Sequence, residues 1–278
     1  MHRRRSSALG AGCQACEFCL VQVKGFGMMA RLLAGMARAR ASAEVMKRIR
    51  SASFSQYGED VLLSHLKPEA RGFCVDVGAY HPVSLSNTYK LYLKGWRGIT
   101  VEPNPDMAPL FRRFRPGDLH LQIGISSEPG ELTYYRSDDP HENTFDGEWA
   151  TSRPGRNIDS LSIPCLPLSD ALITHAPSQH VDLLNVDCEA RDLDVLRSLD
   201  WEHDRPTAII VEDFQAFRAG TSNGCASAIR DFMFERSYAI AAQCVFSFIY
   251  VDRTAFGRPP NGNGFRLGDS QLEGLLRL

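Results

Sequence analysis

The stretch at residues 72–80 constrains the fold of this 278-residue chain more than any other; its sequence is Gly-Phe-Cys-Val-Asp-Val-Gly-Ala-Tyr. An apolar run at 73–77 contains Asp76 as its one polar residue and is ended by Gly78. Such a run predicts a strand that is buried on both faces, as in parallel sheets. Because open α/β sheets bind ligands at the carboxyl ends of their strands, we predict a cofactor loop directly after this strand.

Helical and strand-like segments alternate along the chain. Apolar spacing predicts helices at 59–66, 86–93, 106–114, 168–175, 193–199 and 225–235. Short apolar runs predict strands at 73–77, 99–101, 119–125, 181–186, 208–211, 238–245 and 248–251. This order is typical of an α/β fold with a mostly parallel, doubly wound sheet, helices on both faces and a closing hairpin.

One segment, residues 129–167, interrupts the alternation. It contains short β-like pieces on either side of a polar loop at 136–157. An insertion of this length in a compact domain is more often a lid or binding loop than a passive connection. We therefore expect it to help select the substrate. Tyr134, Tyr135 and Trp149 either offer aromatic faces to a sugar ring or pack within the domain.

Acidic residues stand at the carboxyl ends of the predicted parallel strands. Asp76, Glu102 and Asp187 each lie at such an end, and Glu189 lies just beyond the last of them. Because these ends share one edge of a parallel sheet, we expect the four acids to lie close together. Glu212 also ends a strand, but we interpret it as a helix cap or a solvated loop acid.

The spacing of glycines distinguishes between cofactors. Glu102 follows Asp76 by 26 residues, and an acid at the end of the second strand binds ribose hydroxyls in nucleotide folds. A dinucleotide needs G-x-G-x-x-G so that the backbone can approach its pyrophosphate. Here Gly78 stands alone, and Tyr80 and Pro82 occupy the later positions. The pattern therefore favours S-adenosylmethionine, which has no pyrophosphate, over NAD or ATP.

Several blocks of sequence resemble the FkbM family of S-adenosylmethionine-dependent methyltransferases. They are Ser-Gln-Tyr-Gly-Glu-Asp at 55–60, Asp-Val-Gly-Ala-Tyr-His-Pro at 76–82, Ser-Asn-Thr at 86–88, Gly-Trp-Arg-Gly at 95–98, Glu-Pro-Asn at 102–104, Leu-Asn-Val-Asp-Cys-Glu at 184–189, and Arg-Pro at 205–206 leading to Val-Glu at 211–212. The resemblance extends over residues 53–252. It implies a class I methyltransferase fold, with a seven-stranded sheet and an antiparallel last strand. It also implies O-methylation of a hydroxyl on a sugar, glycan or natural product.

The same resemblance implies which residues bind the cofactor. The matching positions are Gln56, Asp76, Gly78, Ala79, Tyr80, Ser86, Asn87 and Glu102. One departure lies on the substrate side. The family usually has Gly after the acid at position 189 and often Glu two positions later, whereas this chain has Ala190 and Asp192. We expect Ala190 to narrow the backbone freedom of this turn without forbidding it, because Gly is obligatory only where φ is positive.

Methyl transfer to a hydroxyl requires positioning of the acceptor and a base that takes its proton. The candidates are Asp187, Glu189 and His81. We favour the two acids, because class I methyltransferases commonly place substrate-side groups beyond the fourth strand. His81 has the natural pKa for a base, but it lies in the cofactor loop. A divalent metal held by the two acids is the alternative to a base; it is not expected, because no third ligand is evident.

Charge divides the chain into a basic arm and an acidic body. Residues 1–50 contain ten Lys or Arg and two Asp or Glu, whereas the remainder contains 21 and 31. An acidic body is poorly suited to nucleic acid. The arm is too short and too charged in its apolar part to span a bilayer. We predict a methyltransferase domain over 51–278, preceded by a disordered or amphipathic extension that makes weak contact with an anionic membrane surface.

The eight cysteines are scattered, which suits the reducing cytoplasm, and we expect the protein there or at the inner membrane face. Cys13, Cys16 and Cys19 have C-x2-C-x2-C spacing, which we interpret as incidental thiols rather than a metal site.

Two other functions compete with methylation. One is a cofactor-binding but inactive module recruited by the basic arm. The other is a dehydrogenase, which the missing glycines disfavour. No oligomeric state is predicted.

Overall fold

The computed structural model describes residues 53–66, 71–152, 155, 157–213 and 227–255. The predicted extension at 1–50, with its three cysteines, and the tail from 257 lie outside the described residues. In the described part of the chain, no helix has the length and apolar character needed to cross a bilayer.

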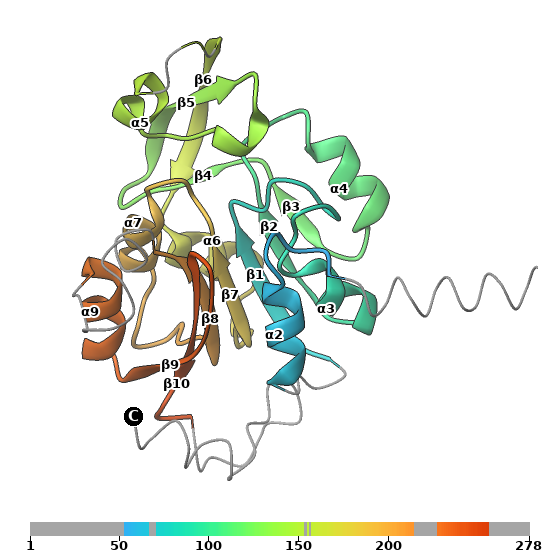
Figure 1. Ribbon diagram of the computed structural model, residues 1–278, viewed down its shortest axis with the longest axis vertical. Helices are drawn as coiled ribbons and strands as arrows, with labels where there is room; N and C mark the ends of the chain where they lie inside the picture. The colour runs from blue at the N-terminus through green and yellow to red at the C-terminus, as the bar shows by residue number, and fades with distance from the viewer. Residues whose placement is uncertain (1–52, 67–70, 153–154, 156, 214–226, 256–278) are drawn as a thin grey trace, which may run out of the picture. The chain divides into compact units, whose positions relative to one another are not determined.

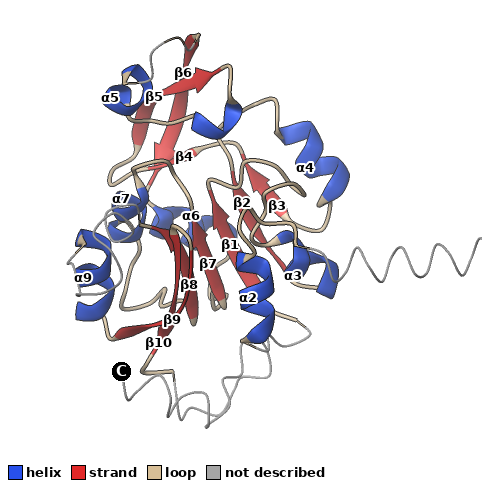
Figure 2. Cartoon of the chain, viewed as in Figure 1, coloured by secondary structure: helices blue, strands red, loops and turns tan. Residues whose placement is uncertain are grey.

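A seven-stranded sheet forms the centre of the domain (Figures 1 and 2). In sequence order its strands are β1 (Phe73–Val77), β2 (Arg97–Val101), β3 (Leu119–Leu121), β7 (Leu183–Val186), β8 (Ala208–Glu212), β9 (Tyr238–Cys244) and β10 (Ser247–Asp252). Their order across the sheet is β3-β2-β1-β7-β8-β10-β9. The first five are parallel, and β10 is antiparallel to both of its neighbours. This confirms the predicted α/β class and the antiparallel last strand.

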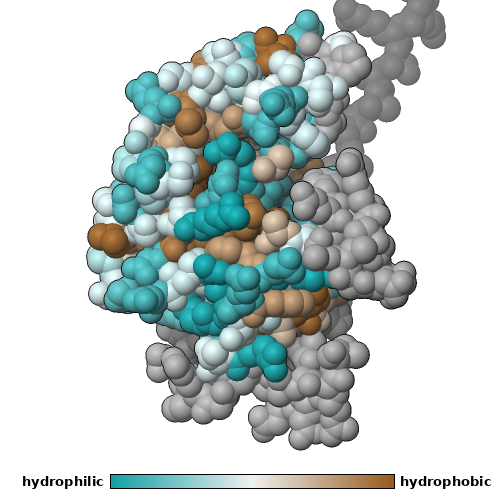
Figure 3. All heavy atoms as spheres, turned by 90° about the vertical axis from the view of Figure 1, so that its left-hand side faces the viewer, coloured by the Kyte–Doolittle hydropathy of each residue, from teal (hydrophilic) through white to brown (hydrophobic). Residues whose placement is uncertain are grey.

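Helices cover both faces of this sheet. They are α2 (Glu59–His65), α3 (Tyr89–Lys94), α4 (Ala108–Phe114), α6 (Leu168–His175), α7 (Asp192–Arg197) and α9 (Ala228–Glu235). Each predicted helix is present, although α3 and α9 begin three residues later than predicted. Figure 3 shows the side of the molecule that carries α7 and α9; its surface is mostly hydrophilic, with smaller apolar patches. The helices therefore turn their apolar sides toward the sheet.

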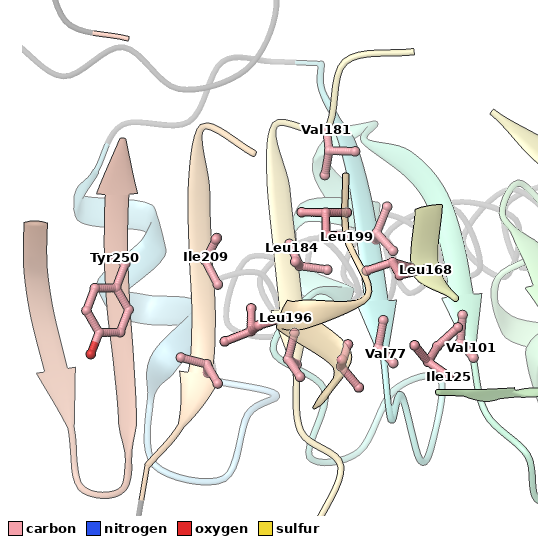
Figure 4. Packing of buried hydrophobic residues seen from close by; sticks show 14 of the residues in the cluster. Val77, Val101, Ile125, Leu168, Val181, Leu184, Leu196, Leu199, Ile209 and Tyr250 are labelled. Atoms are coloured by element: carbon pink, nitrogen blue, oxygen red, sulfur yellow. The ribbon is translucent and has the colours of Figure 1, made fainter. Parts of the chain in front are cut away.

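Two hydrophobic cores lie on opposite faces of the sheet, because side chains alternate along each strand. In β1, Val75 and Val77 belong to the core that also contains Leu168 of α6 and Leu196 of α7 (Figure 4). Cys74 belongs to the other core, together with side chains of α2 and α3. Burial on both faces explains why this strand is a continuous apolar run in the sequence.

The predicted third strand at 119–125 is wrong as a single element. After β3 the chain leaves the main sheet, and β4 (Gly124–Ile125) pairs with β6 (Ile158–Leu166). Together with β5 (Gly130–Ser137), these strands form a second sheet in the order β4-β6-β5. The break has a physical cause: β2 ends at Val101, shortly before Pro103, so β3 has no pairing partner beyond Leu121.

The predicted loop at 136–157 is also more structured than expected. The strand β5 continues to Ser137, and the 3₁₀ helix η1 (Pro140–Glu142) and the helix α5 (Gly147–Thr151) follow. The side chain of Asp146 accepts a hydrogen bond from the Trp149 N–H at 2.8 Å, which stabilises the first turn of α5. The insertion is therefore a hairpin that carries a short helix.

Candidate active site

A first cavity opens at the carboxyl ends of the parallel strands. It is lined by all eight predicted cofactor residues, Gln56, Asp76, Gly78, Ala79, Tyr80, Ser86, Asn87 and Glu102, and by two predicted catalytic residues, Asp187 and Glu189. The expectation that the acids at the strand ends share one edge is therefore confirmed.

His81 is not among the residues that line this cavity. Its Nδ1 accepts hydrogen bonds from the backbone N–H groups of Val83 at 3.1 Å and Ser84 at 2.9 Å. Partial burial lowers the pKa of His81. The ring therefore holds the turn after the cofactor loop, and the structure does not place it as a base beside the two acids.

Asp76 is 2% exposed, and both of its carboxylate oxygens are occupied by neighbouring side chains. Oδ1 accepts a hydrogen bond from Asn185 at 2.9 Å, and Oδ2 accepts one from the Thr88 hydroxyl and lies 3.4 Å from Arg115. Asn185 also accepts a hydrogen bond from Asn87 at 2.9 Å. Asp76 thus joins β1, β7 and the segment before α3, and it positions the cavity wall.

Glu102 lies in a buried position at the end of β2. Its carboxylate accepts hydrogen bonds from the N–H groups of Asn104 at 2.7 Å and Tyr80 at 2.9 Å and from the Tyr134 hydroxyl at 3.3 Å. Burial raises the pKa of Glu102 to about 7. A carboxylate accepts about four hydrogen bonds, so one acceptor position remains for a ligand hydroxyl.

The backbone N–H groups of the cofactor loop are already used within the protein. Gly78 and Ala79 both donate to the carbonyl oxygen of Val101, at 3.0 and 3.1 Å, and Tyr80 donates to Glu102. A loop that binds a pyrophosphate must instead turn such groups toward the ligand. The geometry therefore fits an adenosine ligand without a pyrophosphate, as the glycine spacing predicts.

Gly78 is required by the close approach of two strand ends. Its φ is +75°, and an added Cβ would lie 1.8 Å from the backbone carbonyl oxygen of Asp187. The end of β1 and the end of β7 therefore approach each other too closely for any side chain at this position. Gly78 makes room for Asp187 rather than for the ligand.

A group of acids surrounds the end of β7 and β8. Burial and the charges of Glu212, Asp192, Glu189 and Asp76 raise the pKa of Asp187 well above its ordinary value. Burial and neighbouring acids likewise raise the pKa of Glu212 to about 8. Our interpretation of Glu212 as a cap or solvated acid is wrong, because the side chain is 9% exposed and lines the cavity.

Within the described residues, no three His, Cys, Asp or Glu side chains are grouped so as to hold a metal ion.

The aromatic residues of the insertion differ from the expected sugar platform. Tyr134 is buried against Phe145, with ring centroids 4.9 Å apart, and its hydroxyl reaches Glu102. Trp149 lines a second cavity that adjoins the first. His141, which the sequence analysis missed, packs on Tyr80 with ring centroids 4.4 Å apart. The insertion therefore supplies part of the wall of both cavities.

The turn after β7 contains two consecutive residues with positive φ, Glu189 at 46° and Ala190 at 80°. Ala190 occupies the position where the resembling family usually has Gly. The turn forms with Ala, but the backbone of Ala190 lies in the left-handed region that L-residues avoid, which is the condition under which Gly is preferred.

Replacing Ala190 with Gly is expected to stabilise the protein by about 1 kcal/mol, since an L-residue pays roughly this amount for a left-handed conformation. Urea unfolding of the wild type and the Ala190→Gly variant measures the difference. Ala150→Gly is the control, because Ala150 lies within α5 and Gly in a helix costs about 0.5–1 kcal/mol. A destabilised Ala190→Gly variant would contradict the assigned strain.

Comparison with known proteins places the chain in a family. The family model described as "Methyltransferase FkbM domain" matches residues 76–240, more than half of the chain. A TehB-like SAM-dependent methyltransferase from Corynebacterium glutamicum ATCC 13032 Kitasato aligns at 10% identity and a TM-score of 0.35, over 78% of this chain and 99% of that chain. A candidate O-methyltransferase from Klebsiella pneumoniae aligns at 12% identity and a TM-score of 0.36, over 72% and 82%. A comparison with curated proteins gives no match. By its match to the family model, the chain belongs to the FkbM family of S-adenosylmethionine-dependent methyltransferases.

Proposed function

We propose that the protein is an O-methyltransferase that acts on a hydroxyl of a sugar, glycan or natural product. The observation that carries this proposal is the cofactor loop, in which the N–H groups of Gly78, Ala79 and Tyr80 all bond within the protein. This arrangement suits the adenosine part of S-adenosylmethionine and disfavours a dinucleotide. Asp187 and Glu189 beyond β7 line the same cavity, and we assign the acceptor to their side of it.

The residues around the cavity divide into two groups by chemistry. Glu102 would accept a hydrogen bond from a ribose hydroxyl, while Asp76 positions the wall through Asn185. When bound, S-adenosylmethionine supplies an electrophilic methyl group. Asp187 would take the proton of the acceptor hydroxyl, with Glu189 as the alternative base. Burial and neighbouring acids raise the pKa of Asp187 well above its ordinary value, which makes its carboxylate a stronger proton acceptor.

Incubation with cofactor labelled in its methyl group and a fractionated cell extract tests the proposal. We expect the label in a small-molecule or glycan fraction, with mass spectrometry locating it on an oxygen. Label in protein or nucleic acid would contradict the proposed acceptor class. Binding of cofactor with no labelled product in any fraction would support the alternative of an inactive cofactor-binding module.

Replacing Glu102 with Ala is expected to weaken binding of S-adenosylhomocysteine roughly 10- to 100-fold, because hydrogen bonds to a charged group contribute about 1.5–3 kcal/mol. Isothermal titration calorimetry measures the dissociation constant. Glu131→Ala is the matched control, since Glu131 is exposed on β5 and bonds there to Ser162. Unchanged affinity in Glu102→Ala would contradict the assignment of the ribose site.

A further inference from the structure

The second cavity shares a wall with the first. Gln56, Leu85, His141, Glu189 and Glu212 line both. The remaining wall of the second cavity comes from the insertion, from α7 and from the start of α9. A molecule in the second cavity would therefore reach the acids beside the proposed cofactor site.

The wall of the second cavity is rich in acidic side chains. Of the fifteen described residues that line it, seven are Asp or Glu and none is Lys or Arg. Such a surface repels phosphate and carboxylate groups, because like charges at short range are unfavourable. An anionic acceptor, such as a sugar phosphate or a uronic acid, does not fit.

Most of these acids have partners within the protein. Asp192 accepts a hydrogen bond from the Cys188 N–H at 2.9 Å, and Asp213 accepts one from the Ser227 hydroxyl. Asp194 forms an ion pair with Arg191 at 3.2 Å. These acids therefore have structural roles that explain their presence without a ligand.

Glu212 is different. Its side chain is 9% exposed and faces both cavities from the end of β8. Within the described residues its carboxylate has no hydrogen bond and no ion pair. Buried carboxylates normally have such partners. A ligand with a positively charged hydrogen-bond donor would supply the missing one.

The rest of the wall of the second cavity is partly apolar and suits the carbon skeleton of a small ligand. Leu85, Leu193 and Ile229 contribute apolar surface, and Trp149 contributes an aromatic ring. Aromatic rings bind both the carbon faces of sugars and the ammonium groups attached to them.

We propose that the second cavity is the acceptor subsite and that the acceptor carries a protonated amino group, which pairs with Glu212. This inference rests on the proposed function and narrows its acceptor to an amino-bearing polyhydroxy compound. The acids around Glu212 disfavour an anionic acceptor. Glu189 lines both cavities together with Glu212, so an acceptor paired with Glu212 would lie beside one of the two candidate bases.

The test uses three probes that differ at one end of a six-carbon polyol: glucamine, with an ammonium group; sorbitol, with a hydroxymethyl group; and gluconate, with a carboxylate. The full chain is first saturated with S-adenosylhomocysteine at pH 8. Each probe is then titrated into it, and calorimetry measures the dissociation constant. We expect glucamine to bind at least about tenfold more tightly than sorbitol, since one charge-assisted hydrogen bond contributes this much, and gluconate to bind weakest. Glu212→Gln should remove the preference. Glu235→Gln should retain it, because Glu235 is 75% exposed on α9.

Several outcomes would overturn the inference. They are equal affinity for glucamine and sorbitol, a preference that survives Glu212→Gln, and tight binding of Mg²⁺ that depends on Glu212. A tenfold loss of S-adenosylhomocysteine affinity in Glu212→Gln would also overturn it, since Glu212 would then bind the cofactor's own ammonium group. Failure of the wild type to bind S-adenosylhomocysteine would instead contradict the proposed function, which separates the two failures.

Discussion

The free energy of unfolding is expected to fall as the pH rises from about 6.5 to about 8, and the Glu212→Gln variant is expected to lose much less. Glu212 keeps its proton in the folded protein up to a pKa of about 8, whereas an ordinary Glu in the unfolded chain releases it near 4.5. Unfolding therefore releases a proton in this range, and a higher pH favours the unfolded state. The loss is about 1.4 kcal/mol for each pH unit in which only the folded state is protonated.

Other groups also affect this range. The pKa of Asp187 is raised well above its ordinary value, so Asp187 contributes to the fall with the same sign as Glu212. Burial raises the pKa of Glu102 to about 7, which adds to the fall up to that pH. Burial lowers the pKa of His120 to about 4, and its effect has the opposite sign, because the unfolded imidazole loses its proton near 6.5. Above that pH the histidine contribution is complete. The range from about 6.5 to about 8 therefore isolates the buried carboxyl groups.

Urea unfolding of the ligand-free protein at pH 6.5, 7, 7.5 and 8 measures the effect. At pH 8 we expect Glu212→Gln to be more stable than the wild type by roughly 2 kcal/mol or more, as a pKa raised by several units implies. Glu235→Gln, whose side chain is exposed, should follow the wild type. Parallel pH profiles for the wild type and Glu212→Gln would show that Glu212 titrates normally.

A variant that gains stability by losing a carboxyl group would show that the acidic cavity is maintained at a cost to the fold. Sites that reduce stability are typical of function, since selection keeps them for activity and not for folding. The left-handed Ala190, in the turn beside the same cavity, adds to this cost. Both features lie beside the second cavity, whereas Asp76 and Glu102 at the ends of β1 and β2 have several hydrogen-bond partners each.

Much of the fold could be predicted because its central strands are buried on both faces. The strand predicted at 73–77 is β1, residue for residue. Apolar runs of this kind need no tertiary information. The split of the third strand could not be predicted in this way, because Gly124 and Ile125 pair with residues of β6 that lie 41 positions later in the sequence. The caps inside the insertion, such as Asp146, were present in the sequence as local signals that we did not use.

The residues of the first cavity at the ends of β1 and β2 were predictable from the sequence, and the environment of Glu212 at the end of β8 was not. Every predicted cofactor residue lines the first cavity. Asn185 was missed, although a polar residue within the apolar run at 183–186 is a signal of a buried hydrogen bond. Glu212 was misjudged because its environment depends on β8 lying between β7 and β10, which enclose its end. No local pattern contains that information.

Replacing Gly78 with Ala is expected to abolish measurable binding of S-adenosylhomocysteine, an effect of at least about 100-fold. The new Cβ would lie 1.8 Å from the Asp187 carbonyl oxygen. Side-chain rotation cannot relieve this clash, because the backbone fixes the positions of both atoms. The ends of β1 and β7 must then separate by more than 1 Å, and the hydrogen bond from the Asp187 N–H to the Val77 carbonyl, 3.0 Å in length, would break. Because Asp76, Ala79 and Tyr80 flank this position, the whole cofactor wall moves.

Gly155→Ala separates this clash from the conformational cost of positive φ. Gly155 has a φ of +85°, and no heavy atom of the described residues lies within 4 Å of a Cβ added there. Gly155→Ala should therefore lose about 1–2 kcal/mol of stability and keep its affinity. Gly78→Ala should lose roughly 3 kcal/mol, since overpacking adds to the same conformational cost, and remain folded by circular dichroism. If Gly78→Ala bound S-adenosylhomocysteine as tightly as Gly155→Ala, the contact between the two strand ends would not control the cofactor site.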